Sequence, residues 1–414
     1  MQTNSSEERL KVLVVALHIE PKGYIGGGWV RLIELLRRAK SNNVDSVLLE
    51  TTPTFNSIFN GLNYEVITVP YFLNRFFIGR IIRCILAVIY GIQRVKRKDI
   101  KLVLSPVELP ECVLQAYIIS RITKIPWTAE LHLIPLYSCF WKNEERAIRA
   151  SSLSSLFHEN RKRGNKFFPS IFSSLILWLT FRSFRKGVML APSKSVIEDM
   201  QNVDKNIVVK SFFPGNGIAL ERIDDVKCRG KLYDAIYVGV LTDKKGVFDA
   251  IYVWRLVVKK KQDAVLAIIG RGNINEIVKI KSLIEKFELG KNIRFPFDLK
   301  TGAPTLEDVW EHMEMSKMLI HLSVSDTWPQ VIGEALACGL PVVTYDLRPQ
   351  RYAFGDCPAV FRVPVKNFEA FASKILEILP YFKEYGEKAR DFAKKYTWDA
   401  VMRAEKQAYL EITE

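Results

Sequence analysis

Runs of apolar residues of strand length recur along the chain, and stretches with helical spacing separate them. The first run, residues 10–17, is almost continuously apolar, which is typical of a parallel strand buried on both faces. A glycine-rich stretch at 23–28 and a helix from about 29 to 40 follow it. This alternation predicts doubly wound α/β structure. Further strands are expected in the first half at 45–50, 65–69, 101–105, 126–132, 188–191 and 207–213.

The alternation restarts after residues 214–217, and a polar stretch at 221–231 suits a linker. A length of 414 residues suggests two or three domains of roughly 100–200 residues each. We therefore predict a first domain at 1–215 and a second at 216–397. Strands of the second are expected at 234–240, 265–269, 292–295, 318–322, 341–345 and 360–363, and helices at 246–261, 274–288, 305–316, 329–338, 366–382 and 383–396.

Charge is distributed unevenly between these halves. Residues 1–215 hold 30 Lys and Arg against 17 Asp and Glu, a net charge of +13, whereas residues 216–414 hold 30 against 28, a net of +2. Nucleic acid, an anionic membrane and a phosphorylated acceptor are all possible partners for so basic a half. The six cysteines are scattered without a C-x-x-C, which argues against a disulfide framework or zinc site and fits a reducing cytosol. The polar N-terminus predicts no signal peptide.

Two basic, aromatic-rich segments lie in the first half, at 71–98 and 161–186. Their charge-free runs are shorter than the ~20 residues needed to span a bilayer. One interpretation makes them core helices whose basic side chains face water. The other makes them amphipathic surfaces that rest on an anionic membrane, since their bases alternate with Phe, Ile and Leu.

The most informative stretch is residues 319–343. An apolar strand precedes Asp326, and a short helix follows, with Thr327 as the expected N-cap and Pro329 in its first turn. Glu334 lies inside that helix, eight positions after Asp326. An open helix N-terminus at the carboxyl end of a strand suits phosphate, so this unit is a candidate ligand site.

This stretch resembles the signature of the retaining family-4 glycosyltransferases, which have the GT-B fold. Their pattern is Glu, seven residues, Glu, and then a helix of small residues that ends in Ala-Cys-Gly-x-Pro-Val-Val. Residues 337–343 read Ala-Cys-Gly-Leu-Pro-Val-Val, and Asp326 stands in place of the first Glu. The resemblance implies two Rossmann-like domains that face each other across a cleft, with a final helix, 398–414, that crosses back to the first domain.

Other residues match the family's pattern less closely. Lys245-Gly246 matches the pair that follows the first strand of the second domain, but Val240 replaces an expected Arg, and Arg271 is a candidate substitute. The segment 346–351 stands where the family often has a Gly-Gly loop. In the first half, the glycine loop ends in Gly27-Gly28, as the family's does, and a family histidine corresponds to His132.

The resemblance implies a retaining hexosyltransferase with a nucleotide-sugar donor. His132, Asp326 and Lys245 are the expected catalytic residues, and Glu334 would bind the ribose hydroxyls. The remaining donor-binding candidates are Gly27, Gly28, Arg271, Trp328, Gln330 and Val331. Because the chain has no Asp-x-Asp motif, we expect no metal, and the nucleotide sugar is a substrate, so no cofactor is implied. Fixed positive charge and amides would stabilise the leaving diphosphate instead.

The acceptor is expected to be a glycan or a lipid-linked molecule, reached by a protein that lies peripherally on the cytoplasmic face of an anionic membrane. Three alternatives stay open. The departures at Val240 and Asp326 also suit a non-catalytic glycosyltransferase-like subunit, and a sugar-nucleotide epimerase would have the same fold. A nucleic-acid binder would use the basic half, but no nucleic-acid motif occurs, so we expect no nucleic-acid partner.

Overall fold

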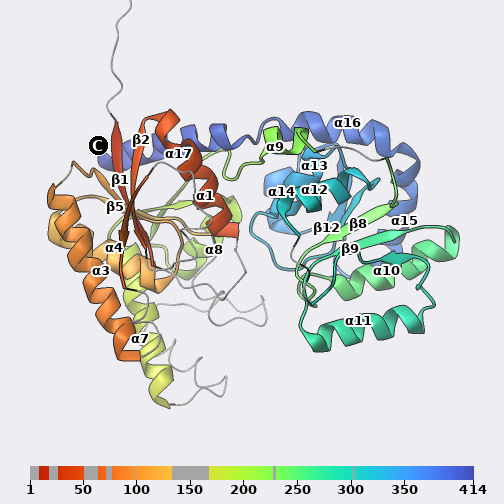
Figure 1. Cartoon of the computed structure of the whole chain (residues 1–414), viewed down its shortest axis with the longest axis horizontal. Coiled ribbons are helices and arrows are strands. Elements are labelled where there is room, and N and C mark those ends of the chain that lie inside the picture. The colour runs from red at the N-terminus through yellow and green to blue at the C-terminus, as the bar shows by residue number, and fades with distance from the viewer. Residues whose placement is uncertain are drawn as a thin grey trace, which may run out of the picture. The chain divides into compact units, whose positions relative to one another are not determined.

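The structure, a computed structural model, describes residues 9–17, 27–50, 64–70, 77–97, 99–132, 167–226, 230–300, 302 and 304–414. It divides the chain into two compact units. Unit 1 comprises Met1–Asn216 with Trp398–Glu414, and unit 2 comprises Gly217–Thr397. Each unit contains a parallel sheet with helices packed around it, so the predicted α/β class is confirmed (Figure 1).

Unit 1 contains a five-stranded parallel sheet in the order β3-β2-β1-β4-β5. β1, β4 and β5 are almost completely buried, as their apolar sequences predict, whereas β3 at the edge of the sheet is intermediate to exposed. Their bounds are β1 Leu10–Ala16, β2 Val44–Glu50, β3 Glu65–Thr68, β4 Leu102–Ser105 and β5 Trp127–Ala129. A parallel bridge between Glu130 and Leu190 continues the sheet into the pair β6 Val188–Ala191 and β7 Val208–Ser211.

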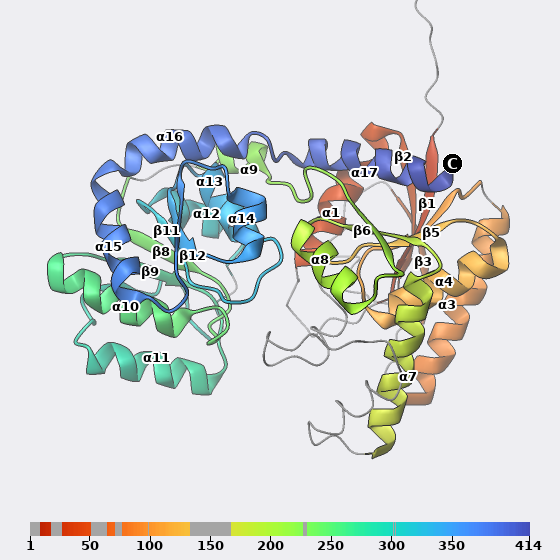
Figure 2. The same cartoon turned by 180° about the vertical axis from the view of Figure 1, so that it is seen from behind.

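The helices of unit 1 include the element that ends the chain. α17, Trp398–Thr413, packs against α1, Gly27–Ala39, so the final helix is part of this unit. On the other side, α4, Pro110–Thr123, packs against the sheet and against both α3, Phe77–Arg97, and α7, Phe167–Phe184 (Figure 2). The unit also contains a 3-10 turn at Lys40–Asn42 and α8, Lys194–Val203.

Unit 2 contains a six-stranded parallel sheet in the order β10-β9-β8-β11-β12-β13. The strands are β8 Ala235–Val238, β9 Leu266–Ile269, β10 Ile293–Arg294, β11 Leu319–His321, β12 Val342–Tyr345 and β13 Val360–Val363. The helices are α9 Leu220–Asp224, α10 Val247–Lys260, α11 Ile274–Lys286, α12 Leu306–Glu314, α13 Gln330–Ala337, α14 Arg348–Phe354, α15 Phe368–Ile378 and α16 Phe382–Ala393. Capping boxes begin α11 at Asn273 and α12 at Thr305.

Three local predictions need correction, and one segment is now described. The expected linker at 221–231 contains most of α9, because Ile223 is apolar enough to be buried. The segment 346–351 leads into the helix α14, which begins at Arg348 and has Pro349 in its first turn. The expected helix 366–382 ends at Ile378, where a 3-10 turn with Pro380 follows. The N-cap of α13 is Pro329 instead of Thr327, because the chain is still extended at Pro329.

Some segments that the sequence marks as notable are not among the described residues. Residues 23–26 of the glycine loop, 71–76 and 98 of the first basic segment, and 161–166 of the second all lie outside the described residues. Within the described residues, no helix is both long and apolar enough to cross a membrane.

Candidate functional site

The strand order of unit 2 reverses between β8 and β11, and two loops meet there. The chain runs outward in one direction from β8 through β9 and β10, and in the other from β11 through β12 and β13. The loop after β8 carries Lys245, and the segment after β11 carries Asp326. Such a switch point at the carboxyl ends of parallel strands is where open α/β sheets bind ligands.

Gly246 allows the first loop to pass close to the second. Its φ is 77°, and an added Cβ would lie 2.0 Å from the carbonyl oxygen of Leu322. A backbone hydrogen bond of 3.0 Å, from Val324 N to Lys244 O, joins the two segments. Only glycine tolerates both the left-handed conformation and this close approach. Gly246 therefore fixes the backbone position of Lys245 beside the segment that follows β11.

Asp326 lies between a lysine and a histidine. Lys245 Nζ donates to its Oδ1 at 2.6 Å and to the carbonyl oxygen of Ser325 at 3.1 Å. His321 Nε2 lies 3.3 Å from Asp326 Oδ2. Burial alone would raise the pKa of Asp326, but His321 and the charge of Lys245 outweigh it and hold that pKa well below its usual range. The carboxylate is therefore ionised and held on both sides.

Sequence reasoning missed His321, which ends β11. Its ring is buried, and Nδ1 lies 3.1 Å from the hydroxyl oxygen of Thr344 on the neighbouring strand. The available signal was that His321, like Ser323, is a polar side chain inside the otherwise apolar run 319–324. Since one ring nitrogen meets Thr344 and the other faces Asp326, His321 orients the carboxylate.

The N-terminus of α13 lies directly beyond Asp326, and among the described residues no side chain caps it. The side chain of Gln330 is engaged elsewhere, because its Nε2 donates to the carbonyl oxygen of Gly217 at 2.7 Å. The first-turn amides of Gln330 and Val331 therefore provide the positive end of the helix dipole to a ligand. This arrangement keeps both residues as candidates through their backbones.

Glu334 lies one turn further along α13 and is 9% exposed. Burial raises the pKa of Glu334 to about 7, against opposing effects of the Trp310 indole and the charge of Arg222. Trp310 Nε1 has no hydrogen-bond partner within the described part of the chain. A buried carboxyl group that is half protonated near neutral pH can both donate to and accept from uncharged hydroxyl groups.

The side chains of two donor-binding candidates, Trp328 and Arg271, already contact other parts of unit 2. The ring of Trp328 packs against Phe354 and Tyr396, with centroids 5.2 and 6.1 Å away, so it anchors the loop before α13. Arg271 Nε donates to the carbonyl oxygen of Gly302 at 2.7 Å. Its backbone lies beside the β8 loop, since its carbonyl oxygen accepts from Leu241 N at 2.8 Å. Neither contact tests the predicted role.

In unit 1, His132 and the start of α1 are in contact. An added Cβ on Gly28 would lie 3.1 Å from His132 Cδ2, and Gly27 is the first residue of the helix. His132 Nε2 lies 3.1 Å from the carbonyl oxygen of Pro106. A carbonyl can only accept, so this contact favours a proton on Nε2 and leaves Nδ1 as an acceptor.

A buried charge cluster lies behind His132. Arg31 Nε donates to Glu130 Oε2 at 2.8 Å, Nη1 donates to the carbonyl oxygen of Gly215 at 2.7 Å, and Nη2 donates to Glu405 of α17. Glu130 Oε2 is also 3.5 Å from His132 Nε2. Arg31, Glu130 and Glu405, which we call the Arg31 cluster, are at most 2% exposed.

The pKa values of the two acids of the Arg31 cluster shift in opposite directions. Burial and the neighbouring charge of Glu130 raise the pKa of Glu405 well above its usual range, despite Arg31. Burial also acts to raise the pKa of Glu130, but Arg31 and His132 outweigh it and lower that pKa. Glu405 therefore holds a proton more readily than Glu130 does. No local sequence pattern could have shown these contacts, which join α1, β5 and α17.

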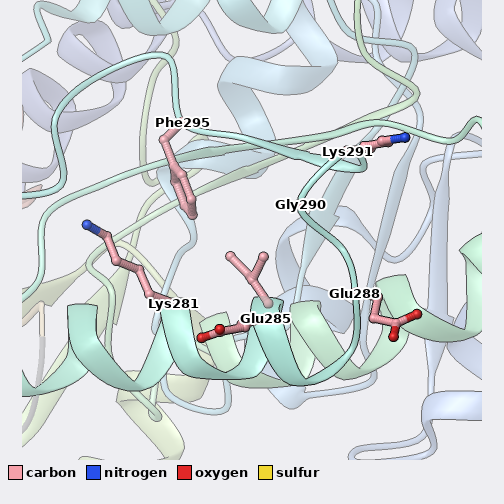
Figure 3. A pocket seen from close by; sticks show the side chains of 7 residues that line it. Lys281, Glu285, Glu288, Gly290, Lys291 and Phe295 are labelled. Atoms are coloured by element: carbon pink, nitrogen blue, oxygen red, sulfur yellow. The ribbon is translucent and has the colours of Figure 1, made fainter.

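A hollow of about 640 Å³ lies elsewhere on unit 2, beside α11 (Figure 3). It lies between this helix and the chain that leads through Gly290 to Phe295. Its charged residues have mixed sign, with Lys281 and Lys291 against Glu285 and Glu288. No residue that the sequence predicts for the site lines it, so the chemistry described above, rather than this hollow, defines the candidate site.

Comparisons with known proteins show similarity to glycosyltransferases. Residues 221–395 match the family model described as Glycosyl transferases group 1. An uncharacterised glycosyltransferase of Haemophilus influenzae is 26% identical over 158 residues, which are 37% of this chain and 42% of that protein. An uncharacterised glycosyltransferase of Methanocaldococcus jannaschii is 25% identical over 163 residues, 39% of this chain and 35% of that protein. The matched stretches thus span less than half the length of either relative.

Solved structures show the fold of the whole chain. A glycosyltransferase from Rickettsia africae aligns with a TM-score of 0.67 at 15% identity and covers 99% of both chains. Anabaena HepE, solved in complex with UDP-glucose, aligns with a TM-score of 0.66 at 14% identity and covers 97% of this chain and 100% of its own. The predicted GT-B fold is therefore confirmed.

Proposed function

Because residues 221–395 match the family model of the glycosyl transferases group 1, we propose that the protein is a retaining hexosyltransferase with a nucleotide-sugar donor. The observation that carries the proposal is the contact of Lys245 with Asp326 at the switch point of unit 2. It places a cation, a carboxylate and an uncapped helix N-terminus within one small region. These are the groups needed for a diphosphate bound to a sugar.

Each group has a role that its surroundings support. Lys245 and the amides of Gln330 and Val331 bind the diphosphate and stabilise the negative charge that grows on it as the glycosidic bond breaks. Asp326 accepts hydrogen bonds from hydroxyl groups of the sugar, because His321 and Lys245 keep it ionised. Glu334 binds the ribose hydroxyls. Trp328 and Arg271 contribute by holding the loops on either side.

Unit 1 contributes the remaining groups in this proposal. His132 offers Nδ1 to a hydroxyl group of the transferred sugar, while Pro106 holds the opposite ring nitrogen. Gly27 and Gly28 allow the donor phosphates to approach the first turn of α1, where a larger side chain at position 28 would meet the His132 ring. This division assigns the donor mainly to unit 2 and the acceptor to unit 1.

For the acceptor we propose a glycan carried by a lipid or otherwise held at a membrane. The basic, aromatic-rich segments of unit 1 support an acceptor held at a membrane. The four cysteines in the described residues are free thiols, which suits a reducing compartment and therefore the cytoplasmic face. Neither observation concerns the donor reaction, which can be tested without an acceptor.

Donor binding and donor hydrolysis test the proposal directly. A panel of nucleotide sugars should contain one that raises the melting temperature, because a ligand of the folded state stabilises it by mass action. Glu334→Ala should lower transfer or donor hydrolysis by about 10- to 150-fold, since a lost hydrogen bond to a charged group costs roughly 1.5–3 kcal/mol. Normal turnover in a folded Glu334→Ala protein would refute the assignment.

The same assays separate the alternatives. A non-catalytic subunit would bind a donor without hydrolysing it, even with acceptor extracts present. An epimerase would return a nucleotide sugar of altered configuration and release no free sugar. A retaining transferase would release the nucleoside diphosphate and keep the anomeric configuration in its product.

A further inference from the structure

Helix α3 is turned with its isoleucines outward. Positions 83, 87, 91 and 95, one helical turn apart, are buried and hold Arg83, Ala87, Gly91 and Val95. A helix on a water-soluble protein normally buries its large aliphatic side chains instead. The outward positions of α3 hold Ile81, Ile82, Ile85 and Ile89, which are 42–54% exposed.

Close packing on α4 fixes this orientation. An added Cβ on Gly91 would lie 2.5 Å from Cδ1 of Ile119 in α4, so the helices approach at a glycine. Small residues at helix contacts are typical of helices whose large side chains face lipid. Arg83 is buried on the same side, and its Nε and Nη1 have no hydrogen-bond partner among the residues described. The helix therefore buries a cation while it exposes four isoleucines.

The two neighbouring helices carry exposed aliphatic residues as well. α4 packs against both α3 and α7, and Figures 1 and 2 show α3 and α7 side by side, extending past the sheet. We call the eight exposed aliphatic residues of these helices the aliphatic face. They are Ile81, Ile82, Ile85 and Ile89 of α3, Ile118 and Ile122 of α4, and Leu175 and Leu179 of α7.

Positive charge adjoins the aliphatic face. The sequences of α3, α4 and α7 contain one acidic residue, Glu111. Apart from Arg185, which pairs with Asp204, six exposed bases lie in the C-terminal ends of the three helices or within two residues after them. We call these six the basic edge: Lys96, Arg97, Arg121, Lys124, Arg182 and Lys186. Three of these, Arg121, Lys124 and Lys186, line a hollow of about 420 Å³ between the ends of α4 and α7.

We propose that the aliphatic face and the basic edge together dock unit 1 on an anionic lipid bilayer. Aliphatic side chains enter the interface between headgroups and acyl chains, while the adjoining bases contact lipid phosphates. Contact with a second copy fits less well, because a symmetric dimer would bring one basic edge near the other. The proposal deepens the proposed function by naming the partner that presents the acceptor, but it does not require glycosyl transfer.

Vesicle sedimentation with matched variants tests the docking. The intact protein is mixed with vesicles of phosphatidylcholine alone or of equimolar phosphatidylcholine and phosphatidylglycerol. We expect it to sediment with the anionic vesicles and much less with the neutral ones. Ile85→Gln/Ile122→Gln should lower the partition coefficient on anionic vesicles by about tenfold or more, since both side chains would lose their apolar environment.

A control pair of equal exposure is available on unit 2. Ile274 and Val278 of α11 are 58% and 59% exposed, against 54% and 56% for Ile85 and Ile122. Ile274→Gln/Val278→Gln should sediment like the unmodified protein. Arg121→Glu/Lys124→Glu/Lys186→Glu should weaken binding to anionic vesicles more than to neutral ones, and salt should reproduce part of that effect.

The proposal is overturned if the protein does not sediment with anionic vesicles at low salt. It is also overturned if both pairs of glutamine substitutions reduce vesicle binding equally. If size-exclusion chromatography shows a dimer that Ile85→Gln/Ile122→Gln converts to a monomer, while vesicle binding is absent, the face joins two copies instead. Donor-induced thermal shift, measured without vesicles, should be unchanged in every variant, so a failure of docking and a failure of the proposed reaction are distinguishable.

Discussion

Each unit places a carboxylate–cation pair just beyond its strands, and the two pairs differ in how far water reaches them. In unit 1, Arg31 and Glu130 are almost completely buried, with Glu405 of the final helix closing the group. In unit 2, the side chain of Lys245 is 36% exposed and that of Asp326 is 12% exposed. The first pair has no room for a ligand, whereas the second keeps one side open. We infer that the first supports the fold and the second is available for chemistry.

The largest expected effect on stability comes from a substitution that breaks the buried Arg31–Glu130 pair. Arg31→Met should destabilise the protein by roughly 3–5 kcal/mol, because it leaves the Glu130 carboxylate buried without its cation. Denaturant unfolding followed by fluorescence measures this loss. If Arg31→Met unfolds within about 1 kcal/mol of the unmodified protein, the cluster does not stabilise unit 1 and the comparison fails.

The next effect concerns the buried Glu334 and its pH dependence. Its pKa is about 7 in the folded protein against 4.5 normally, so the folded state binds more protons than the unfolded state between these values. Stability from this group is therefore present below about pH 4.5 and is lost as the pH rises through 7. The change amounts to about 3 kcal/mol.

Glu334→Gln isolates this contribution, because an amide cannot ionise. The free energy of unfolding should be measured from pH 5 to pH 8 in both proteins, and their difference should grow in favour of Glu334→Gln with rising pH. Glu50 is buried as well and its pKa is also raised to about 7, so Glu50→Gln is a control that should remove a separate part of the slope. Parallel curves for Glu334→Gln and the unmodified protein would contradict the prediction.

A substitution in the partly exposed Lys245–Asp326 pair should change stability little but should weaken ligand binding. Lys245→Ala should weaken nucleoside diphosphate binding by about 10- to 150-fold, since a charged hydrogen bond contributes roughly 1.5–3 kcal/mol. Stability should change far less than in Arg31→Met, because the lysine head is partly in water and His321 still contacts Asp326. Calorimetric titration with a nucleoside diphosphate measures the affinity, and an unchanged affinity would remove Lys245 from the site.

The same contrast explains what the sequence could predict. Residues 319–343 form a continuous local pattern that matches a family signature, so the strand, the helix and both carboxylates could be predicted from that resemblance. Lys245 was predicted because Lys245-Gly246 matches the family's pair, and the left-handed backbone at Gly246 gives a physical reason for the glycine. These signals are local, since each depends on a short stretch of chain.

The Arg31 cluster has no such signal. Arg31 is 99 residues from Glu130 and 374 from Glu405, and each acid alone resembles an ordinary solvated side chain in sequence. The outward face of α3 was one of two interpretations of residues 71–98, because hydrophobic spacing indicates an apolar stripe but not which side faces solvent. Tertiary packing decides both features.

The smallest expected effect lies inside the buried cluster itself and sharpens the comparison. Burial and Glu130 hold the pKa of Glu405 well above its usual range, which favours its uncharged form. Glu405→Gln should therefore change stability by less than about 1 kcal/mol, because it keeps a neutral group of similar shape that can still accept from Arg31. Glu130→Gln should destabilise by several times more, because it removes the ionised partner of a buried arginine. Equal losses at pH 7, measured by denaturant unfolding, would mean that both acids are charged.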